Sequence, residues 1–238
     1  MTTHLSTAQD SVRRDLPGEP VEVIRFTSRG SELLCSLCGG TGWRRAGNVD
    51  CIGYRRCECV DARLVAGRLA AIPALFREAM FESYHPRNAL QERAVALMKD
   101  RPDGSWYITG HYGSGKTHLF YAQCREIAVA GKTRCHVRTT RELVEELKRG
   151  ELDSDFVPPV MAAAYARAPY HLFWDDIEKL KLTEFKDEVL FELVDALYRH
   201  KHGLTVTSNL SLQELAERER MHPAIVRRLD DICRVIQI

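Results

Sequence analysis

Apolar and polar positions follow two different periods in the second part of this sequence. Short apolar runs predict buried strands, and the longer segments between them carry apolar residues every three or four positions, as amphipathic helices do. The predicted strands are SWYIT (105–109), TRCHVR (133–138), YHLFWDD (170–176), LTVTSN (204–209) and CRVIQI (233–238). Strands that alternate with helices in this way indicate an α/β fold, with a mostly parallel sheet covered on both faces.

The predicted helices are defined by their end signals as well as by their period. They cover residues 89–100, 116–131, 139–150, 159–168, 184–203 and 211–219. Thr139 and Glu142 have the spacing of a capping box. Gly131, Gly150 and Gly203 are the expected stops. The inward faces are expected at Leu90, Ala94 and Leu97 in the first helix, and at Val189, Leu193, Val194 and Leu197 in the long one.

The first part of the chain has a different composition. Residues 1–34 mix polar residues with two prolines and show no period, so we expect a flexible arm. Residues 35–60 hold five of the eight cysteines. A helical stripe follows until Pro73 interrupts it. We therefore expect a cysteine-rich module (35–60), a helical linker (61–83) and an α/β domain (84–238).

Charge and hydropathy limit the possible partners and locations. The 34 Lys and Arg residues nearly balance the 33 Asp and Glu residues, so a nucleic acid would have to be held by a local patch. No apolar run reaches about 18 residues, and the first thirty residues lack a signal-peptide core. We expect a soluble, cytoplasmic protein. Cysteines inside helix and strand patterns favour metal binding over disulfides.

A phosphate-binding loop is the strongest motif. Gly110, Gly115, Lys116 and Thr117 fit GxxxxGK[ST], between a predicted strand and a predicted helix. Glycines let backbone N–H groups fold around phosphate, Lys116 would reach the β and γ phosphates, and Thr117 a magnesium ion. The expected ATP-contacting residues are Gly110, His111, Tyr112, Gly113, Ser114, Gly115, Lys116, Thr117 and His118. The alternative is an ordinary glycine-rich turn at a helix start.

Acidic residues follow the buried strand 170–176. Asp175 is the expected magnesium carboxylate, and Asp176 is the candidate that polarises the attacking water. Glu178 is a third acid, which we expect to be solvated. The alternative is that the two aspartates start a turn and cap the next helix.

Asn209 ends the strand 204–209. If the strands are parallel, this amide lies at the same edge as the phosphate loop and can contact the γ-phosphate or its water. The alternative is that Asn209 caps the helix that begins at SLQEL.

Together these parts resemble the AAA+ ATPases, and within them the DnaC/DnaI-type helicase loaders and the IstB transposition ATPases. The similar segments are GHYGSGKTHL, HLFWDDIEKL, VTSNLSLQEL and IVRRLDDICRVIQI, over residues 84–238. The resemblance implies that an arginine of one subunit reaches the nucleotide of its neighbour. Arg228 matches that position, and Arg227 replaces the usual serine. The alternative is that both are solvated residues on a helix surface.

Two departures bear on activity. Asp176 stands where most AAA+ enzymes have Glu, a feature that the loader subfamily shares, and its shorter arm predicts slow turnover. The printed sequence ends with CRVIQI, so we expect no C-terminal helical lid. This expectation argues against an unfoldase or protease partner.

The cysteine-rich module has the spacing of a zinc site. Cys35 and Cys38 form CxxC, and Cys57 and Cys59 offer a second pair, so four thiolates suit one structural zinc. Cys51 could substitute in the second pair. The alternatives are a redox CxxC and unconnected cysteines. The segment also resembles the N-terminal region of DnaC-like loaders, whereas IstB proteins generally lack these cysteines.

Basic and aromatic residues alternate within the same module. They are Arg44, Arg45, Arg55 and Arg56, beside Trp43 and Tyr54. This mixture predicts contact with single-stranded DNA, a docking face for a protein, or a solvated surface.

The sequence thus predicts an ATP- and magnesium-dependent AAA+ ATPase with a zinc module. The resemblance implies a helicase loader in replication initiation, with a replicative helicase as partner and self-association through the arginine finger. The alternatives are an IstB-like transposition helper and a nucleotide-gated adaptor without hydrolysis.

Overall fold

A computed structural model describes residues 26–29, 32–39, 41–46, 53–180 and 184–238 of the chain. It divides the chain into two compact units, Met1–Gly67 and Arg68–Ile238. Cys51 and most of the expected arm lie outside the described residues. The boundaries of the four expected parts stay predictions.

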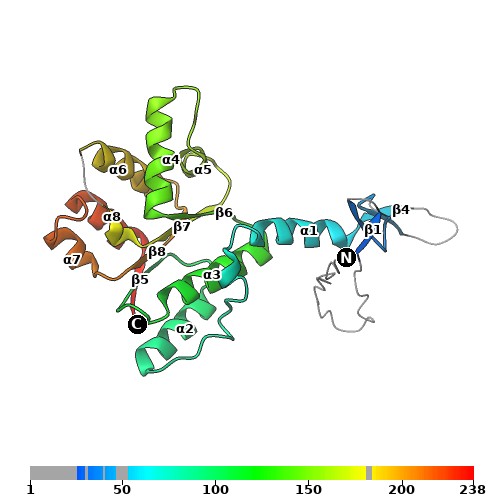
Figure 1. The fold of residues 1–238 in the computed structure, drawn as a ribbon, viewed down its shortest axis with the longest axis horizontal. Helices are drawn as coiled ribbons and strands as arrows, with labels where there is room; N and C mark the ends of the chain where they lie inside the picture. Colours follow the sequence, from blue (N-terminus) through cyan, green and yellow to red (C-terminus); the bar gives the residue numbers. More distant parts are fainter. Residues whose placement is uncertain (1–25, 30–31, 40, 47–52, 181–183) are drawn as a thin grey trace, which may run out of the picture. The chain divides into compact units, whose positions relative to one another are not determined.

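The second unit is built on a five-stranded sheet in the order β6-β7-β8-β5-β9, and every pair of neighbours in it is parallel (Figure 1). The strands are β5 (Trp106–Thr109), β6 (Arg134–Thr139), β7 (Tyr170–Asp175), β8 (Gly203–Ser208) and β9 (Arg234–Gln237). The expected α/β fold with a parallel sheet is confirmed. Because all five strands run the same way, their carboxyl ends meet at one edge of the sheet.

Helices cover both faces of this sheet. They are α2 (Ala89–Asp100), α3 (Lys116–Ala130), α4 (Thr140–Leu152), α5 (Pro159–Ala164), α6 (Glu184–Arg199), α7 (Leu212–Glu217) and α8 (Pro223–Ile232), with short 3₁₀ turns η1 (Ala74–Phe76) and η2 (Ile177–Lys179). In β5, Tyr107 packs in one apolar cluster and Trp106 and Ile108 pack in another. Alternate residues of the strand therefore face two separate cores.

Two predicted helix stops are wrong. Gly150 lies inside α4, which runs to Leu152, and a Cβ there would meet Pro158 Cγ at 2.4 Å. Gly203 is the first residue of β8, where a Cβ would meet His171 Nδ1 at 2.0 Å. Both glycines make room for a neighbouring side chain instead of ending a helix. The predicted stop at Gly131 is confirmed, with φ of 71°.

The predicted apolar face of α2 is also rotated. Leu90 is 55% exposed, and the buried positions are Gln91, Ala94 and Met98. Gln91 faces inward because its side chain accepts a hydrogen bond from the Arg87 N–H and donates to a carbonyl of the phosphate loop. A polar contact thus overrides the hydrophobic pattern. The helix α8 was not predicted as a separate element.

The first unit contains two hairpins and the start of a helix. Strand β1 (Phe26–Arg29) pairs antiparallel with β2 (Glu32–Cys35), and β3 (Trp43–Ala46) pairs antiparallel with β4 (Gly53–Arg56). Helix α1 (Glu58–Leu69) follows β4 and begins within this unit. The apolar cluster of this unit is small and contains Cys35, Cys57 and Cys59. None of the described helices is long and apolar enough to span a membrane.

Candidate functional site

The phosphate-binding loop connects β5 to α3, as the sequence predicts. Gly113 and Gly115 have φ of 76° and 95°, a region that side chains disfavour. A Cβ on Gly115 would meet Tyr84 Cε2 at 2.6 Å, and a Cβ on Gly110 would meet the Ile238 carbonyl oxygen at 2.0 Å. The loop therefore needs these glycines both for its conformation and for close packing.

Two side chains that the sequence did not single out hold the loop from behind. The Tyr84 hydroxyl and the Gln91 amide both donate to the Ser114 carbonyl, at 3.0 and 3.1 Å. Tyr84 also packs edge-on against the His118 ring. In the sequence, Gln91 is a polar residue within an otherwise apolar helix face, and this position could have indicated its role.

Lys116 is folded back onto the loop. Its ammonium donates to the carbonyls of Gly110 and His111, both at 2.8 Å, and the side chain is buried. Burial lowers its pKa, whereas the acids Glu178, Asp176 and Asp175 oppose that shift. The buried Ser114 hydroxyl oxygen has no hydrogen-bond partner among the described residues. A phosphate would give both groups a better acceptor, so the loop fits the triphosphate of a nucleotide.

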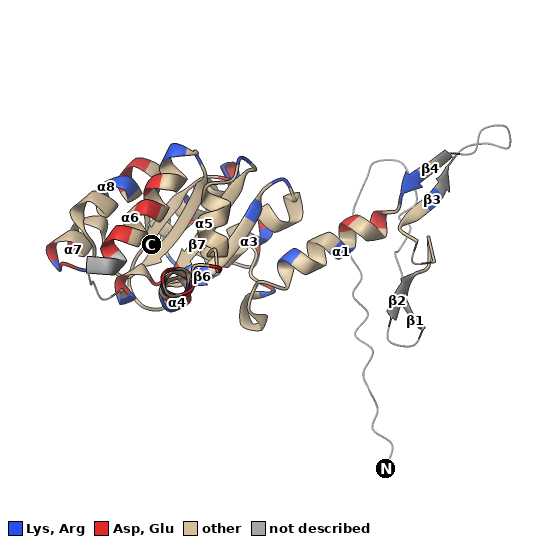
Figure 2. Ribbon diagram, turned by 90° about the horizontal axis from the view of Figure 1, so that it is seen from above, with Lys and Arg blue, Asp and Glu red and all other residues tan. Residues whose placement is uncertain are grey.

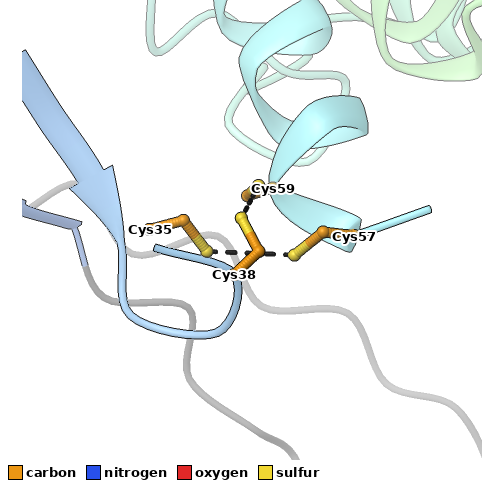
Figure 3. A group of neighbouring side chains, drawn as sticks. All are labelled: Cys35, Cys38, Cys57 and Cys59. Atoms are coloured by element: carbon orange, nitrogen blue, oxygen red, sulfur yellow. Dashed lines mark hydrogen bonds between the residues drawn. The ribbon is translucent and has the colours of Figure 1, made fainter. Parts of the chain in front are cut away.

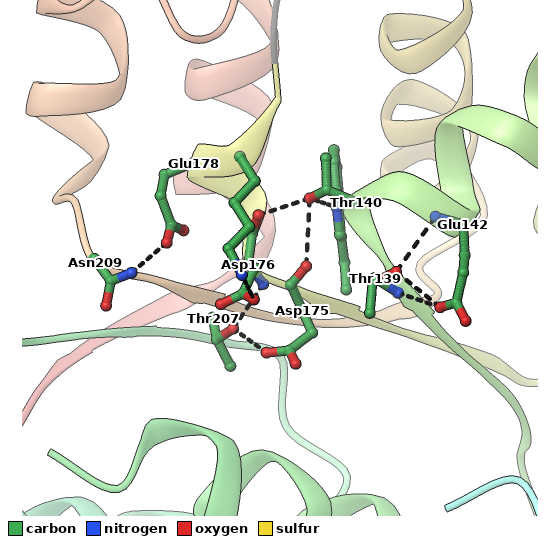
Figure 4. A network of polar contacts seen from close by, with 10 residues as sticks. Thr139, Thr140, Glu142, Asp175, Asp176, Glu178, Thr207 and Asn209 are labelled. Atoms are coloured by element: carbon green, nitrogen blue, oxygen red, sulfur yellow. Dashed lines mark hydrogen bonds and ion pairs between the residues drawn. The ribbon is translucent and has the colours of Figure 1, made fainter. Parts of the chain in front are cut away.

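Asp175 ends β7 at the expected edge of the sheet (Figure 4). It is 8% exposed, and burial raises the pKa of its carboxyl group, although a hydrogen bond from Thr207 opposes the shift. A buried carboxylate near a phosphate loop suits a magnesium ion, together with the Thr117 hydroxyl at the start of α3. The residues present thus fit the expected ion.

Asp176 is clamped through its backbone. Its φ of 58° is left-handed, and its N–H donates to the Thr207 hydroxyl at 2.9 Å. Its carbonyl accepts from the Thr140 hydroxyl at 2.8 Å, and its carboxylate pairs with the Lys179 ammonium. Asp176 is the N-cap residue of η2, as the alternative expects, although its side chain makes no capping hydrogen bond there.

Thr140 and Thr207 are site residues that the sequence analysis missed. Thr140 also accepts a hydrogen bond from the buried Trp174 indole, at 2.9 Å. Thr207 comes from the middle of the run TVTSN, where it reads as an ordinary strand residue. The hydroxyl of Thr140 at the start of α4 and that of Thr207 on β8 therefore hold the Asp176 backbone from both sides (Figure 4).

Glu178 is not solvated as expected. One of its carboxylate oxygens accepts a hydrogen bond from the Asn209 amide, at the end of β8 (Figure 4). The other oxygen, Oε2, and the Asn209 Oδ1 are buried without a hydrogen-bond partner among the described residues. Asn209 does not cap α7, because Ser211 and Glu214 form the capping box there. Asn209 therefore lies at the carboxyl edge of the sheet with an unused acceptor.

Arg228 is held by side chains of α6 and α8. Its guanidinium pairs with Asp195 at 3.1 Å and Asp231 at 3.4 Å, and stacks over Tyr198. Its neighbour Arg227 is exposed. The pair lies on α8, and Arg228 joins that helix to α6.

The four predicted cysteine ligands come together in the first unit (Figure 3). All four sulfur atoms of Cys35, Cys38, Cys57 and Cys59 lie within 4.8 Å of one another, with 3.9 Å between Cys35 and Cys57 and 3.5 Å between Cys38 and Cys59. A tetrahedral zinc with Zn–S bonds of about 2.3 Å holds its sulfurs about 3.8 Å apart.

Backbone amides support the same sulfurs. The Leu37 and Gly42 N–H groups donate to the sulfurs of Cys35 and Cys38, at 3.4 and 3.3 Å. Such bonds stabilise thiolates. The cluster thus has the donor set, spacing and supporting contacts of a structural zinc site.

On the β3–β4 ribbon the two aromatic residues share one face with Arg56, whereas Arg44 and Arg55 lie on the other face. Pairing of Trp43 with Arg56, and of Arg45 with Tyr54, places these positions on one side of the ribbon. Arg44 and Arg55 pair on the other side, where both contact Glu58, at 3.2 and 3.7 Å. Trp43 is 57% exposed and Tyr54 is 70% exposed. Figure 2 shows the basic residues on these strands.

Comparison with known proteins agrees with this architecture. A family model described as IstB-like ATP binding protein matches residues 78–238. The structure of DnaI aligns with a TM-score of 0.58 at 20% identity, covering 70% of this chain and 94% of DnaI. The DnaC helicase loader aligns with a TM-score of 0.56 at 22% identity, covering 69% and 99%.

The replication initiator DnaA, bound to AMPPCP and single-stranded DNA, aligns with a TM-score of 0.53 at 20% identity, covering 68% of this chain and 50% of that one. At these identities, the likeness to solved structures shows the fold. No curated protein matches the sequence.

Proposed function

The chain belongs to the family of IstB-like ATP binding proteins, with an AAA+ domain of the IstB/DnaC type, and on this premise we propose that it hydrolyses ATP to load or remodel a replicative helicase on DNA during replication initiation. The place of action would be the cytoplasm. The observation that carries the choice of a loader is the four-cysteine cluster joined to this ATPase fold.

The AAA+ domain supplies the groups that ATP hydrolysis needs. The backbone from Gly110 to Thr117 would enclose the phosphates, and Lys116 would exchange its two loop carbonyls for the β and γ phosphate oxygens. Thr117 and Asp175 would hold magnesium, which neutralises phosphate charge. Asn209 would place its amide beside the γ-phosphate.

A neighbouring copy of the chain would complete the site. An arginine from the RRL segment stabilises charge on the transferred phosphoryl group through its planar fork. Arg228 is the position that the family resemblance indicates, and its pairing with Asp195 would orient it from α8. We therefore propose self-association, with Arg228 acting in trans.

The first unit would hold one zinc ion and contact single-stranded DNA. Zinc replaces the core that so short a segment cannot build from apolar residues alone. On the β3–β4 ribbon, the exposed Trp43 and Tyr54 would stack on bases while Arg56 contacts phosphate. On the other face of the ribbon, Arg44 and Arg55 already contact Glu58.

The function is tested with purified full-length protein and Lys116→Ala. We expect wild type to hydrolyse ATP, and the variant to lose nucleotide binding and turnover. Affinity capture from the host with and without ATP should recover a hexameric replicative helicase that depends on the nucleotide state.

Two other outcomes would replace this proposal. Recovery of a transposase without a helicase would favour a transposition helper of the IstB kind. Nucleotide binding with turnover at background, even with partner and single-stranded DNA, would favour a nucleotide-gated adaptor.

A further inference from the structure

The Ser114 carbonyl of the phosphate-binding loop accepts two side-chain hydrogen bonds. The Tyr84 hydroxyl donates to it at 3.0 Å and the Gln91 amide at 3.1 Å. Both side chains are buried, with exposed fractions of 9% for Tyr84 and 5% for Gln91. A carbonyl oxygen has two lone pairs, so two residues from outside the loop fix the direction of this one.

We propose that Tyr84 and Gln91 are positioning residues for the triphosphate, which turn the peptide between Ser114 and Gly115 so that the Gly115 N–H serves a bound phosphate. This inference rests on the proposed ATPase function and deepens it. It gives a role to two residues that lie outside the GxxxxGK[ST] motif. The role concerns the binding of the nucleotide and not the chemical step.

The geometry of the peptide group connects the carbonyl to the phosphate. A trans peptide is planar, and its N–H points opposite to its carbonyl. Since the Ser114 carbonyl faces Tyr84 and Gln91, the Gly115 N–H points away from both side chains. Loops of this kind bind phosphate with N–H groups, and a carbonyl oxygen in the same place would repel it. Rotation of this one peptide would therefore replace a donor with an acceptor.

Gly115 makes such a rotation easy unless the carbonyl is held. Its φ of 95° lies in the left-handed region, and glycine has more backbone freedom than any other residue. A Cβ at this position would meet Tyr84 Cε2 at 2.6 Å and the Tyr84 hydroxyl oxygen at 2.8 Å. The tyrosine thus lies directly against the peptide that it holds. The glycine supplies the conformation, and the two donors restrict it.

Both donors are themselves held in place. Gln91 Oε1 accepts a hydrogen bond from the Arg87 N–H at 2.6 Å. Because a backbone N–H can only donate, the oxygen of the amide must face Arg87, and the NH₂ group is left for Ser114. The Tyr84 ring packs edge-on against the His118 ring, with 5.4 Å between the ring centroids. The direction of each donor is therefore set by a further contact.

The test measures the affinity of the full-length protein for fluorescent ATP and ADP analogues. Tyr84→Phe removes only the hydroxyl, and Gln91→Met removes the donor at a similar size. We expect each variant to bind both analogues about 3- to 10-fold more weakly, and the double variant to bind them more weakly than either. At saturating ATP, kcat should change less than about twofold, because the peptide acts on binding.

Tyr170→Phe is the matched control. It removes another buried tyrosine hydroxyl, which lies 3.4 Å from His136 Nδ1. Tyr170 is the first residue of β7, at the end of the strand opposite to Asp175. This variant should keep the affinity of wild type for both analogues. Melting temperatures verify that every variant is folded in the assay.

Unchanged affinity in both Tyr84→Phe and Gln91→Met would overturn the inference and leave nucleotide binding intact, as would a loss of kcat without a loss of affinity. An equal loss of affinity in Tyr170→Phe would identify general destabilisation and also overturn it. Absence of nucleotide binding in wild type would overturn the proposed function and the inference together. Binding without turnover would remove only the proposed hydrolysis, since the affinities still decide the inference.

Discussion

The hydroxyl of Thr207 on β8 donates a hydrogen bond to the carboxylate of Asp175 on β7. This bond joins the proposed magnesium ligand to the next strand of the sheet. Because Thr207 also accepts the Asp176 N–H, one hydroxyl sets the orientation of the whole acidic strand end. The geometry of the site therefore depends on the register between β7 and β8.

Removal of this hydroxyl should weaken both the fold and the site. We expect Thr207→Val to cost about 1 to 3 kcal/mol of unfolding free energy, because a buried carboxylate loses its donor. ATP turnover should fall as well. Urea denaturation and steady-state ATPase assays measure the two effects. Thr207→Ser keeps the hydroxyl and serves as control, and an equal loss in both variants would contradict the role of the hydrogen bond.

The parts of the fold that could be predicted from the sequence are those with a local signal. The strand before the phosphate loop, the loop itself and the capping box at Thr139 all depend on residues close together in the chain. Their positions follow from period and turn chemistry alone. The order of the strands in the sheet, by contrast, cannot be predicted from any single segment of the sequence.

The parts that could not be predicted depend on contacts between distant residues. Glu178 looks solvated in the sequence because its partner, Asn209, lies on another strand. Gly203 looks like a helix stop, yet it is required by the His171 ring on the neighbouring strand. Gln91 looks misplaced on an apolar helix face until its contact with the Ser114 carbonyl is known. In each case, tertiary packing overrides a local rule.

Metal removal should unfold the first unit and leave the second intact. We expect about one zinc per chain from metal analysis of reduced protein, and loss of that zinc in Cys59→Ser. Unfolding of this unit is measured by far-UV circular dichroism at β-strand wavelengths and by proteolysis. Tryptophan fluorescence is less suitable, because Trp43 is already exposed in the folded unit.

The ATPase domain of the same sample is the internal control for metal removal. Its melting transition should change little after chelation, since its core consists of two apolar clusters that do not include the four cysteines. Protein purified under reducing conditions without bound zinc, and with no change on chelation, would exclude the structural role of the four cysteines.

Complementation should detect the arginine in trans. Lys116→Ala and Arg228→Ala should each be inactive alone, and a mixture should recover part of the turnover, because one interface then combines an intact loop with an intact arginine. The control is a mixture of Lys116→Ala with the double variant Lys116→Ala/Arg228→Ala, which should stay inactive because neither chain has an intact loop. If a mixture of Lys116→Ala with Arg227→Ala recovers turnover and a mixture with Arg228→Ala does not, Arg227 is the arginine that acts in trans.

Acid should destabilise the second unit through His171. Complete burial lowers the pKa of this imidazole from 6.5 to about 3, and its ring contacts the Thr205 hydroxyl at 2.9 Å. Between these two pKa values the unfolded chain binds one more proton, so stability is fully present above 6.5 and falls as pH decreases. The expected loss is about 1.4 kcal/mol per pH unit, or about 2 kcal/mol at pH ~5.

Urea titrations at several pH values measure this slope. His171→Gln should have a shallower pH dependence, although the buried His202 and half-buried His136, whose pKa values burial also lowers, leave part of it. The control substitution is His85→Gln, at an exposed position. An unchanged slope in His171→Gln would contradict the buried neutral state.

Single-stranded DNA affinity should depend on the aromatic face of the β3–β4 ribbon. Trp43→Ala and Tyr54→Ala should each weaken binding of an oligonucleotide roughly 5- to 100-fold, because a stacked base contributes about 1 to 3 kcal/mol. Fluorescence anisotropy of a labelled oligonucleotide measures the affinity, and zinc content verifies the fold of each variant. Phe191→Ala removes an exposed aromatic of the ATPase domain and should leave DNA affinity unchanged. Loss of helicase capture in Trp43→Ala with intact DNA affinity would instead identify the ribbon as a protein-docking face.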